Sequence, residues 1–167
     1  MINEEIETKM REFAEVLKYK FNDISWLKKA MGSIKIKIEG QGKNGSKYAN
    51  EGLATVGDAV LKSVIADYLY SVKENATKGY ITKVKSKLES NSVLHEIMEK
   101  KGWLKYAYND LHFYDENNPP NEQVVCGEHD PYIEAIVGAM YYDLNYDKTK
   151  EWIVDQLLPL LKEYSDN

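Results

Sequence analysis

Two acidic residues, Asp58 and Glu134, lie inside segments whose apolar patterns predict buried helices. Asp58 belongs to residues 52–70, which read GLATVGDAVLKSVIADYLY. Four apolar residues recur there at spacings of three and four: Leu53, Val56, Val60 and Val64. That spacing predicts a helix that runs straight through Asp58. On a 3.6-residue wheel Asp58 falls between Ile65 and Leu69, so its carboxylate lies on the apolar side.

Residues 131–144 read PYIEAIVGAMYYDL and contain the second acid, Glu134. Apolar and small residues cover this segment on nearly all sides, which is typical of a helix at the centre of a protein. Gly138, one turn after Glu134, would let another helix approach closely. The sequence therefore places one carboxylate in each of two helices that we expect to be buried.

A buried, ionised carboxylate is unfavourable unless something compensates its charge. The pKa can rise until the group is neutral, a basic side chain can pair with it, or two carboxylates can share a metal ion. Arg11 is the single arginine of the chain. A cation between Asp58 and Glu134 would compensate their negative charge. Hard oxygen ligands favour Mg²⁺ or Mn²⁺ over zinc.

Simpler interpretations of both acids stand beside this one. An aspartate after a glycine is often only a helix cap. A glutamate in an apolar helix can be a salt-bridged residue or one at the edge of the buried face. The local patterns leave both alternatives open.

The elements that must position these acids are almost all helical by pattern. Helices are predicted at about 3–19, 24–31, 50–71, from 79 onward, 92–100, from 130 onward and 148–164, the last bent near Pro159. Asn22-Asp23 and Asp130-Pro131 read as helix starts, with Asp130 as N-cap and Pro131 at the first helical position. Residues 33–50, in which isoleucine alternates with lysine before several glycines, predict a loop or a short β-ribbon.

Composition bounds the class of protein. The 167 residues suggest one domain, 43% hydrophobic and 29% charged residues are ordinary for a soluble protein, and no apolar run is long enough to span a bilayer. One cysteine, Cys126, excludes an intrachain disulfide and fits a reducing cytoplasm. The net charge of −5 argues against a general nucleic-acid binder, although local basic patches matter more than the total.

Residues 50–61, NEGLATVGDAVL, resemble the ribonuclease III signature, which is usually written N-E-R-L-E-F-L-G-D-A-V-L. Residues 133–143, IEAIVGAMYYD, resemble the second motif of that family, D-x-x-E-A-x-x-G-A-x-Y-x-D. The segments FNDISWLKKAM and GYITKVKSKLESNSVL resemble its entry segment and its connecting helix. The resemblance covers about residues 13–161, and both motifs occur in order at a separation similar to that of the family.

The resemblance implies an all-α endonuclease domain that forms a homodimer through the signature helix and binds double-stranded RNA. It implies that a divalent metal, Mg²⁺ or Mn²⁺, is held by acidic residues and activates water, leaving 5′-phosphate and 3′-hydroxyl ends. We expect a single ribonuclease III-like domain over residues 1–167, without a C-terminal double-stranded-RNA-binding domain. Alanine at the middle signature position resembles the short bacterial relatives called mini-ribonuclease III.

Carried over position by position, Asp58 and Glu134 match two of the four usual site acids of the family, and Glu51 matches the first signature glutamate. Three other acid positions hold Ala54, Pro131 and Lys78. Asp130 lies one residue out of register and could substitute as a metal ligand, although an Asp-Pro pair reads more simply as a helix cap. Catalysis is therefore assigned to Asp58, Glu134 and Glu51, and metal binding to Asp58, Glu134 and Asp130.

Lysines near the connecting helix are the candidate RNA contacts: Lys78, Lys83, Lys85 and Lys87. They could meet phosphates of an A-form duplex, which proteins recognise mainly by its shape and backbone, or they could simply be a solvated helix face. The leading hypothesis is a metal-dependent endoribonuclease acting on double-stranded or structured RNA. Its rivals are a catalytically inactive RNA-binding or assembly module, and a helical dimerisation module that binds no RNA.

Overall fold

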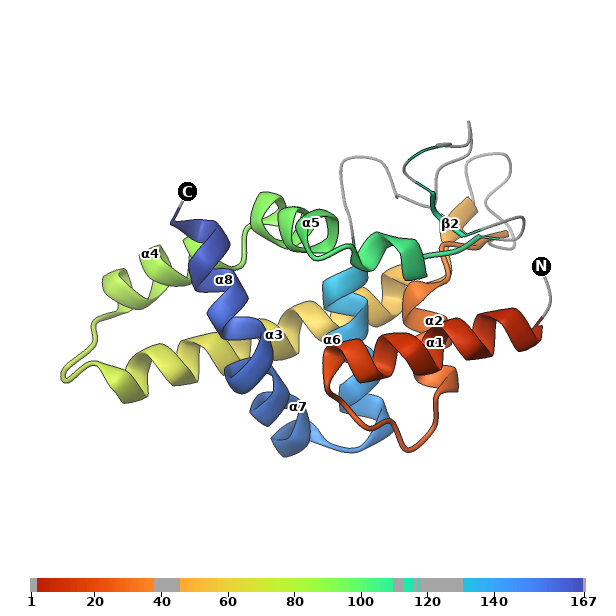
Figure 1. Cartoon of the computed structure of the whole chain (residues 1–167). Coiled ribbons are helices and arrows are strands. Elements are labelled where there is room, and N and C mark those ends of the chain that lie inside the picture. The colour runs from red at the N-terminus through yellow and green to blue at the C-terminus, as the bar shows by residue number, and fades with distance from the viewer. Residues whose placement is uncertain (1–2, 38–45, 110–112, 116, 118–130, 167) are drawn as a thin grey trace.

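The computed structural model describes residues 3–37, 46–109, 113–115, 117 and 131–166, and the predicted all-α class is confirmed over these residues (Figure 1). The α-helices are α1 (Asn3–Leu17), α2 (Ser25–Met31), α3 (Glu51–Val72), α4 (Lys78–Leu88), α5 (Asn91–Lys100), α6 (Tyr132–Asp143), α7 (Tyr146–Trp152) and α8 (Leu158–Ser165). A 3₁₀ turn, η2 (Trp103–Tyr106), follows α5, and a π-helical turn, η3 (Ile153–Leu157), joins α7 to α8.

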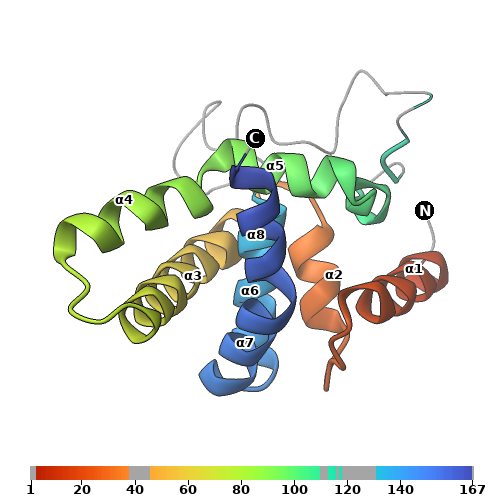
Figure 2. The ribbon, with the colours of Figure 1, turned by 60° about the vertical axis from the view of Figure 1, so that its left-hand side comes forward.

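Helix α6 lies at the centre, and the long helix α3 crosses it (Figures 1 and 2). Most residues of α6 are buried, as its apolar sequence predicts. Helix α2 packs against α6 as well, and the run from α7 to α8 passes alongside α3 and continues against α5. The two motif-bearing helices therefore form the core on which the other helices pack.

Helices α3 and α4 form a hairpin that extends from the body of the molecule (Figure 2). Thr77 is the N-cap of α4, because its hydroxyl oxygen accepts a hydrogen bond from the backbone N–H of Tyr80 at 3.2 Å. The end of α4 leads almost directly into α5, where the hydroxyl of Ser90 accepts from the N–H of Val93. This sharp junction returns the chain toward the core.

The last acid of the second motif, Asp143, ties α6 to the start of α2. Its two carboxylate oxygens accept the backbone N–H groups of Asn22 and Asp23 at 2.8 Å and 2.7 Å. The Asp23 side chain in turn accepts the N–H of Ser25, the first residue of α2. The N-cap of α2 is Ile24 rather than the predicted Asn22-Asp23, which lie just before it and are held by the distant buried carboxylate of Asp143.

The segment with alternating lysines forms a short antiparallel ribbon, as one of its two predicted alternatives had it. Strand β1 (Lys35–Lys37) pairs with β2 (Ser46–Tyr48), with Lys35 opposite Tyr48 and Lys37 opposite Ser46. Within the described ranges no helix is long and apolar enough to cross a membrane.

The start of α6 differs from the sequence prediction, whereas the irregularity before Pro159 agrees with it. Helix α6 begins at Tyr132 with Pro131 in the N-cap position, so the prediction of Pro131 at the first helical position was wrong by one residue. Asp130 lies outside the described residues. The expected irregularity near Pro159 is confirmed, since η3 interrupts the α-helical pattern just before this proline, which has no N–H to donate.

Candidate active site at the crossing of α3 and α6

Two glycines allow α3 and α6 to cross with their backbones in contact. A Cβ atom on Gly57 would overlap the backbone carbonyl oxygen of Glu134, and one on Gly138 would overlap the carbonyl oxygen of Leu53. Only glycine fits at either position. Because Asp58 follows Gly57 directly, this crossing brings the Asp58 side chain to that of Glu134, as the sequence predicts.

A hydrogen bond joins the side chains of Asp58 and Glu134 and favours the protonated form of Glu134. Burial, the hydrogen bond with Asp58 and the negative charge of Asp58 together raise the pKa of Glu134 to about 8, while Lys62 opposes the rise. A protonated Glu134 can donate to Asp58, whose side chain is partly exposed, and this removes one of two neighbouring negative charges. The first of the three remedies for a buried carboxylate, a raised pKa, therefore operates in the cation-free protein.

Lys62 applies the second remedy, an ion pair. Its Nζ donates to Asp58 at 2.9 Å, one helical turn along α3, and both side chains are partly exposed. The hydrogen bond to Asp58 raises the pKa of Lys62, partial desolvation lowers it, and the charges of Asp58, Glu89 and Glu134 raise it. Lys62 therefore lies within electrostatic reach of three carboxyl groups from three parts of the chain.

Glu89 is the third of these carboxyl groups. It caps the C-terminus of α4, and only 8% of its side chain is exposed. Burial raises the pKa of Glu89, whereas its hydrogen bond and ion pair with Lys85 at 3.0 Å, and the charge of Lys62, lower it. We call Asp58, Glu89, Glu134, Lys62 and Lys85 the carboxylate–lysine cluster. Of its three carboxyl groups, Asp58 is paired with Lys62 and Glu89 with Lys85.

Other predicted site residues lie in different places. Glu51 is the first residue of α3, seven residues before Asp58 and thus about 10 Å away along the helix axis. Lys78 begins α4, Lys83 and Lys87 are exposed on it, and Lys85 faces Glu89. The structure therefore separates Lys85, which belongs to the cluster, from the three lysines that face solvent.

Two of the positions at which the family usually has acids are apolar and buried in this chain. Ala54 is 7% exposed and lies on the side of α3 that packs in the core. Pro131 is buried at the start of α6. The candidate site therefore has fewer acids than the family pattern and contains lysines beside them.

The donor chemistry of the Asp58–Glu134 pair fits a hard divalent cation. Mg²⁺ is commonly held by one or two carboxylates and keeps several of its waters. Among the described residues no three acidic, histidine or cysteine side chains are gathered as a ready metal cage. A cation at the pair would therefore displace the Glu134 proton and would be held by two carboxylates rather than by a closed set of protein ligands.

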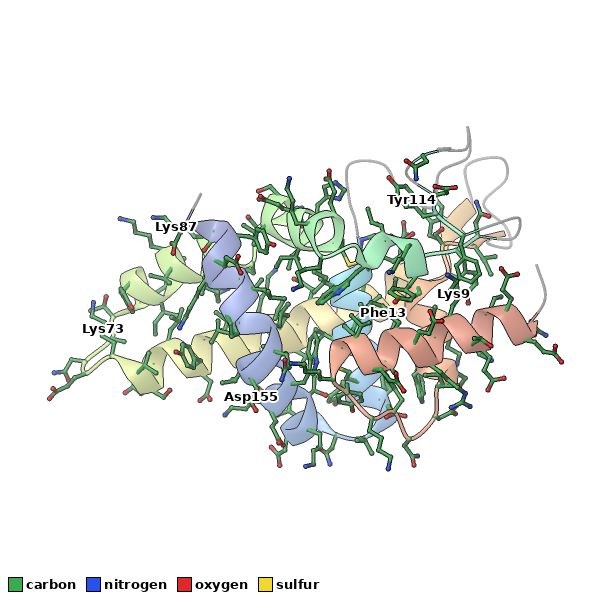
Figure 3. All side chains as sticks on the ribbon, in the orientation of Figure 1. Lys9, Phe13, Lys73, Lys87, Tyr114 and Asp155 are labelled. Atoms are coloured by element: carbon green, nitrogen blue, oxygen red, sulfur yellow. The ribbon has the colours of Figure 1, made fainter. Side chains whose placement is uncertain are left out.

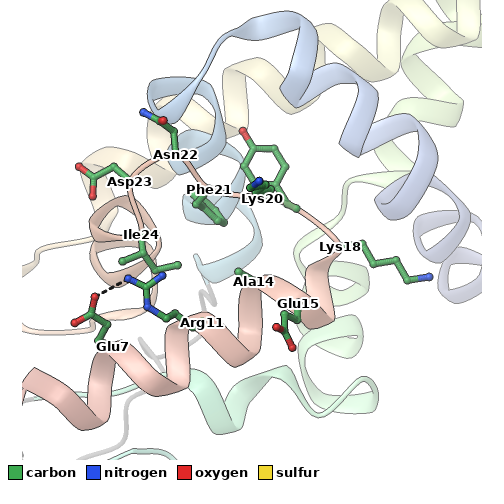
Figure 4. A pocket seen from close by; sticks show the side chains of 11 residues that line it. Glu7, Arg11, Ala14, Glu15, Lys18, Lys20, Phe21, Asn22, Asp23 and Ile24 are labelled. Carbon is green, nitrogen blue, oxygen red and sulfur yellow. Dashed lines mark hydrogen bonds and ion pairs between the residues drawn. The ribbon is translucent and has the colours of Figure 1, made fainter.

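A separate polar pocket lies between α1 and the segment that leads to α2 (Figure 4). Glu7 and Arg11 form an ion pair at 2.8 Å on one wall, and Lys18, Lys20 and Asp23 contribute charged groups elsewhere on its lining. Asp58 and Glu134 do not line it. We assign this pocket no part in the chemistry of the pair.

Glu89 and Lys62 are the two members of the cluster that the sequence did not single out. Lys62 could have been found from its position four residues after Asp58, because residues at that spacing share a helix face. Glu89 carries no such signal toward Asp58. Its approach depends on how α4 folds back along α3, which a single sequence does not display.

Comparison with known proteins identifies the family. The model of the Ribonuclease III domain matches residues 51–145, which contain both Asp58 and Glu134. The chain is 30% identical over 151 residues to Ribonuclease 3 of Fusobacterium nucleatum, covering 90% of this chain and 60% of that protein. It is 28% identical over 144 residues to Ribonuclease 3 of Zunongwangia profunda, covering 86% of this chain and 55% of that protein. The chain thus spans somewhat more than half the length of these relatives.

The fold is also that of a solved nuclease domain. Two structures of the nuclease domain of ribonuclease III from Campylobacter jejuni superpose with TM-scores of 0.65 and 0.62 at 23% and 24% identity. They cover 93% and 98% of this chain, and 95% and 96% of their own chains. Since the family model spans more than half of the chain and includes both acids of the helix crossing, the protein belongs to the ribonuclease III family.

Proposed function

We propose that the protein is a metal-dependent endoribonuclease that hydrolyses phosphodiester bonds in double-stranded or structured RNA, leaving 5′-phosphate and 3′-hydroxyl ends. The observation that carries this proposal is the Asp58–Glu134 pair at the crossing of α3 and α6. Each acid comes from one of the two family motifs, and the two side chains meet although they lie 76 positions apart in the sequence. The similarity to proteins named Ribonuclease 3 supports the class of activity.

Asp58 and Glu134 are proposed to hold the cation, with Mg²⁺ as the first candidate and Mn²⁺ as the second. A bound divalent cation would lower the pKa of the attacking water and neutralise phosphate charge. Glu134 must release its proton before both carboxylates can bind the cation, and Lys62 must then share Asp58 with it. Glu51 and Asp130 remain secondary candidates, for catalysis and for metal binding respectively.

The exposed lysines of α4 are proposed to contact RNA phosphates. Lys78, Lys83 and Lys87 lie on the α4 side of the molecule, and Figure 3 shows Lys87 there together with Lys73 at the tip of the hairpin. The structure supports a smaller role for Lys85, whose ammonium group is paired with Glu89. Phosphate contacts of this kind bind without base specificity and weaken as salt rises.

A second copy of the chain is proposed to cover an apolar hollow beside the helix crossing. The hollow is lined by Trp26, Lys29, Ala49, Gly52, Leu53, Val56 and Tyr142. Trp26 stacks on Tyr142, a side chain that is 48% exposed. The hollow lies on the signature helix, which the family resemblance assigns to the dimer contact. One of the Campylobacter jejuni structures shows structural flexibility in a region involved in dimer formation.

The test is cleavage of an end-labelled RNA duplex in Mg²⁺, in Mn²⁺ and in EDTA. We expect the wild-type protein to cut only with metal, and Asp58→Asn and Glu134→Gln to lose cutting while remaining folded. The matched control is Asp67→Asn on the same helix, where the aspartate is also paired with a lysine, Lys150, at 2.6 Å. This control should cut as the wild type does.

Two results would count against the proposal. If Asp58→Asn cuts as fast as the wild type, the assignment of the site is wrong. If folded wild-type protein binds the duplex equally in Mg²⁺ and EDTA and never cuts it, the rival interpretation, an inactive RNA-binding module, replaces the nuclease.

A further inference from the structure

Glu89 has one carboxylate oxygen that its known contacts do not explain. Oε1 accepts a hydrogen bond from Lys85 at 3.0 Å. Oε2 is buried and has no hydrogen-bond partner among the described residues. Since only 8% of the side chain is exposed, water does not readily compensate this oxygen. A buried, charged oxygen without a partner is rare in folded proteins and calls for a ligand, a water or an ion.

The charged groups that face Glu89 are those of the proposed cation site. The charges of Lys62 and Asp58 act on Glu89 from α3, and Glu89 in turn acts on Glu134 of α6. Lys85 faces it from its own helix, one turn earlier. Three carboxyl groups from three separate elements, α3, the end of α4 and α6, therefore lie within electrostatic reach of one another, although they are not gathered around one point.

Both lysines of the cluster occupy carboxylate oxygens that a cation would use. Lys62 donates to Asp58 at 2.9 Å, and Lys85 donates to Glu89 at 3.0 Å. Each ammonium group balances one negative charge when no divalent ion is present. A divalent cation with its hard preference for oxygen would compete with both lysines for these carboxylates.

We propose that Glu89 is a third carboxylate of the cation site, and that Lys85 is the internal cation with which a metal ion competes for it. Glu89 adds a carboxylate to a site that lacks three of the family's acids, since the chain has Ala54, Pro131 and Lys78 at those positions. Because no three ligands are already gathered around one point in the described residues, Glu89 acts through a metal-bound water or after its side chain turns away from Lys85. This inference rests on the proposed function.

A purely structural role for the Lys85–Glu89 pair makes a different prediction. If the pair only stabilised the junction of α4 and α5, both Glu89→Gln and Lys85→Met would lower stability and neither would change metal affinity. If Glu89 binds at the cation site, the two variants change metal affinity in opposite directions. Glu89→Gln removes a ligand, whereas Lys85→Met removes the competing ammonium and keeps most of the buried stem.

The experiment is titration of metal-free, folded protein with Mn²⁺, followed by the electron paramagnetic resonance signal of free Mn²⁺ and by calorimetry. Against the wild type, we expect Glu89→Gln to weaken binding about tenfold or more. Lys85→Met should bind Mn²⁺ more tightly than the wild type. The matched control, Glu151→Gln, removes an exposed glutamate that pairs with Lys148 at 3.4 Å and should leave affinity unchanged.

The outcomes separate this inference from the proposed function. If Asp58→Asn binds Mn²⁺ as the wild type does, or if the wild type binds none, both proposals fail. If Asp58→Asn loses binding but Glu89→Gln keeps the wild-type affinity, only the role of Glu89 is overturned. Should Glu89→Gln not fold, Lys85→Met decides: tighter binding supports the inference, and unchanged or weaker binding overturns it.

Discussion

Gly57 of α3 lies against the backbone carbonyl of Glu134 in α6, with no space for even a Cβ atom between them. This contact determines how closely the two helices cross. It also places Asp58, the next residue, beside the Glu134 side chain. The glycine of the signature is therefore a packing requirement that positions the acid after it.

The close crossing predicts that Gly57→Ala strongly destabilises the protein. The added methyl group must push two backbones apart in a well-packed core, at a cost of about 3 kcal/mol or more in the free energy of unfolding. Urea denaturation in EDTA would measure it. Gly79→Ala is the control, because nothing lies within 4 Å of a Cβ at Gly79 of α4 and the substitution should stabilise by up to about 1 kcal/mol. Equal stability of Gly57→Ala and the wild type would contradict the crossing.

The raised pKa of Glu134 predicts that the metal-free protein loses stability as the pH rises from about 5 to about 8. The pKa of Glu134 is about 8 in the folded state against 4.5 as the ordinary value, so in this window the folded state holds a proton that the unfolded state has lost. The free energy of unfolding therefore falls with rising pH until about 8, and Glu89 contributes in the same direction. Thermal unfolding in EDTA at a series of pH values would show the slope.

Glu134→Gln should flatten that slope, since a glutamine mimics the protonated carboxyl group at every pH. The exposed variant Glu151→Gln should keep the wild-type slope. In the wild type, Mn²⁺ affinity should rise with pH up to about 8, by at most about tenfold per pH unit for the release of one proton. If the free energy of unfolding of the wild type and that of Glu134→Gln have the same pH dependence across this range, Glu134 is already ionised at neutral pH.

Asp143 is predicted to be needed for stability rather than for chemistry. Both of its oxygens accept backbone N–H groups, and an asparagine can accept through only one oxygen. Asp143→Asn should lower the free energy of unfolding by about 2 kcal/mol, which chemical denaturation would measure. Asp155→Asn, at an exposed position on η3 that Figure 3 labels, should change it by less than about 0.5 kcal/mol. A neutral Asp143→Asn would mean that Asn22 and Asp23 are held by other groups.

The apolar hollow predicts where a charge would prevent dimer formation. Val56 lines the hollow on α3, so Val56→Lys should shift the protein from dimer to monomer in sedimentation velocity runs. Val72→Lys is the control, because Val72 is 58% exposed at the far end of the same helix and outside the hollow. If Val56→Lys remains a dimer, or if the wild type is monomeric at the same concentration, the second copy does not bind this surface.

Much of the fold was predictable from the sequence because helix periodicity is a local property. The spacing of Leu53, Val56, Val60 and Val64 predicted α3, and the apolar run after Pro131 predicted the central position of α6. The two motifs also identified Asp58 and Glu134, since those residues match by type and spacing. What failed was a boundary: Pro131 caps α6 and does not begin it, because proline fits either position.

The sequence by itself determined the helices, the family resemblance and the two acids of the proposed site, all of which depend on residue type and short-range spacing. Only the tertiary structure decided which charges meet. It brought Glu89 from the end of α4 within electrostatic reach of Asp58 and Glu134, and it turned Asp143 to the start of α2. These contacts join segments that are far apart in the chain. The pKa values of the carboxyl groups depend on burial, which exists only once the helices have packed.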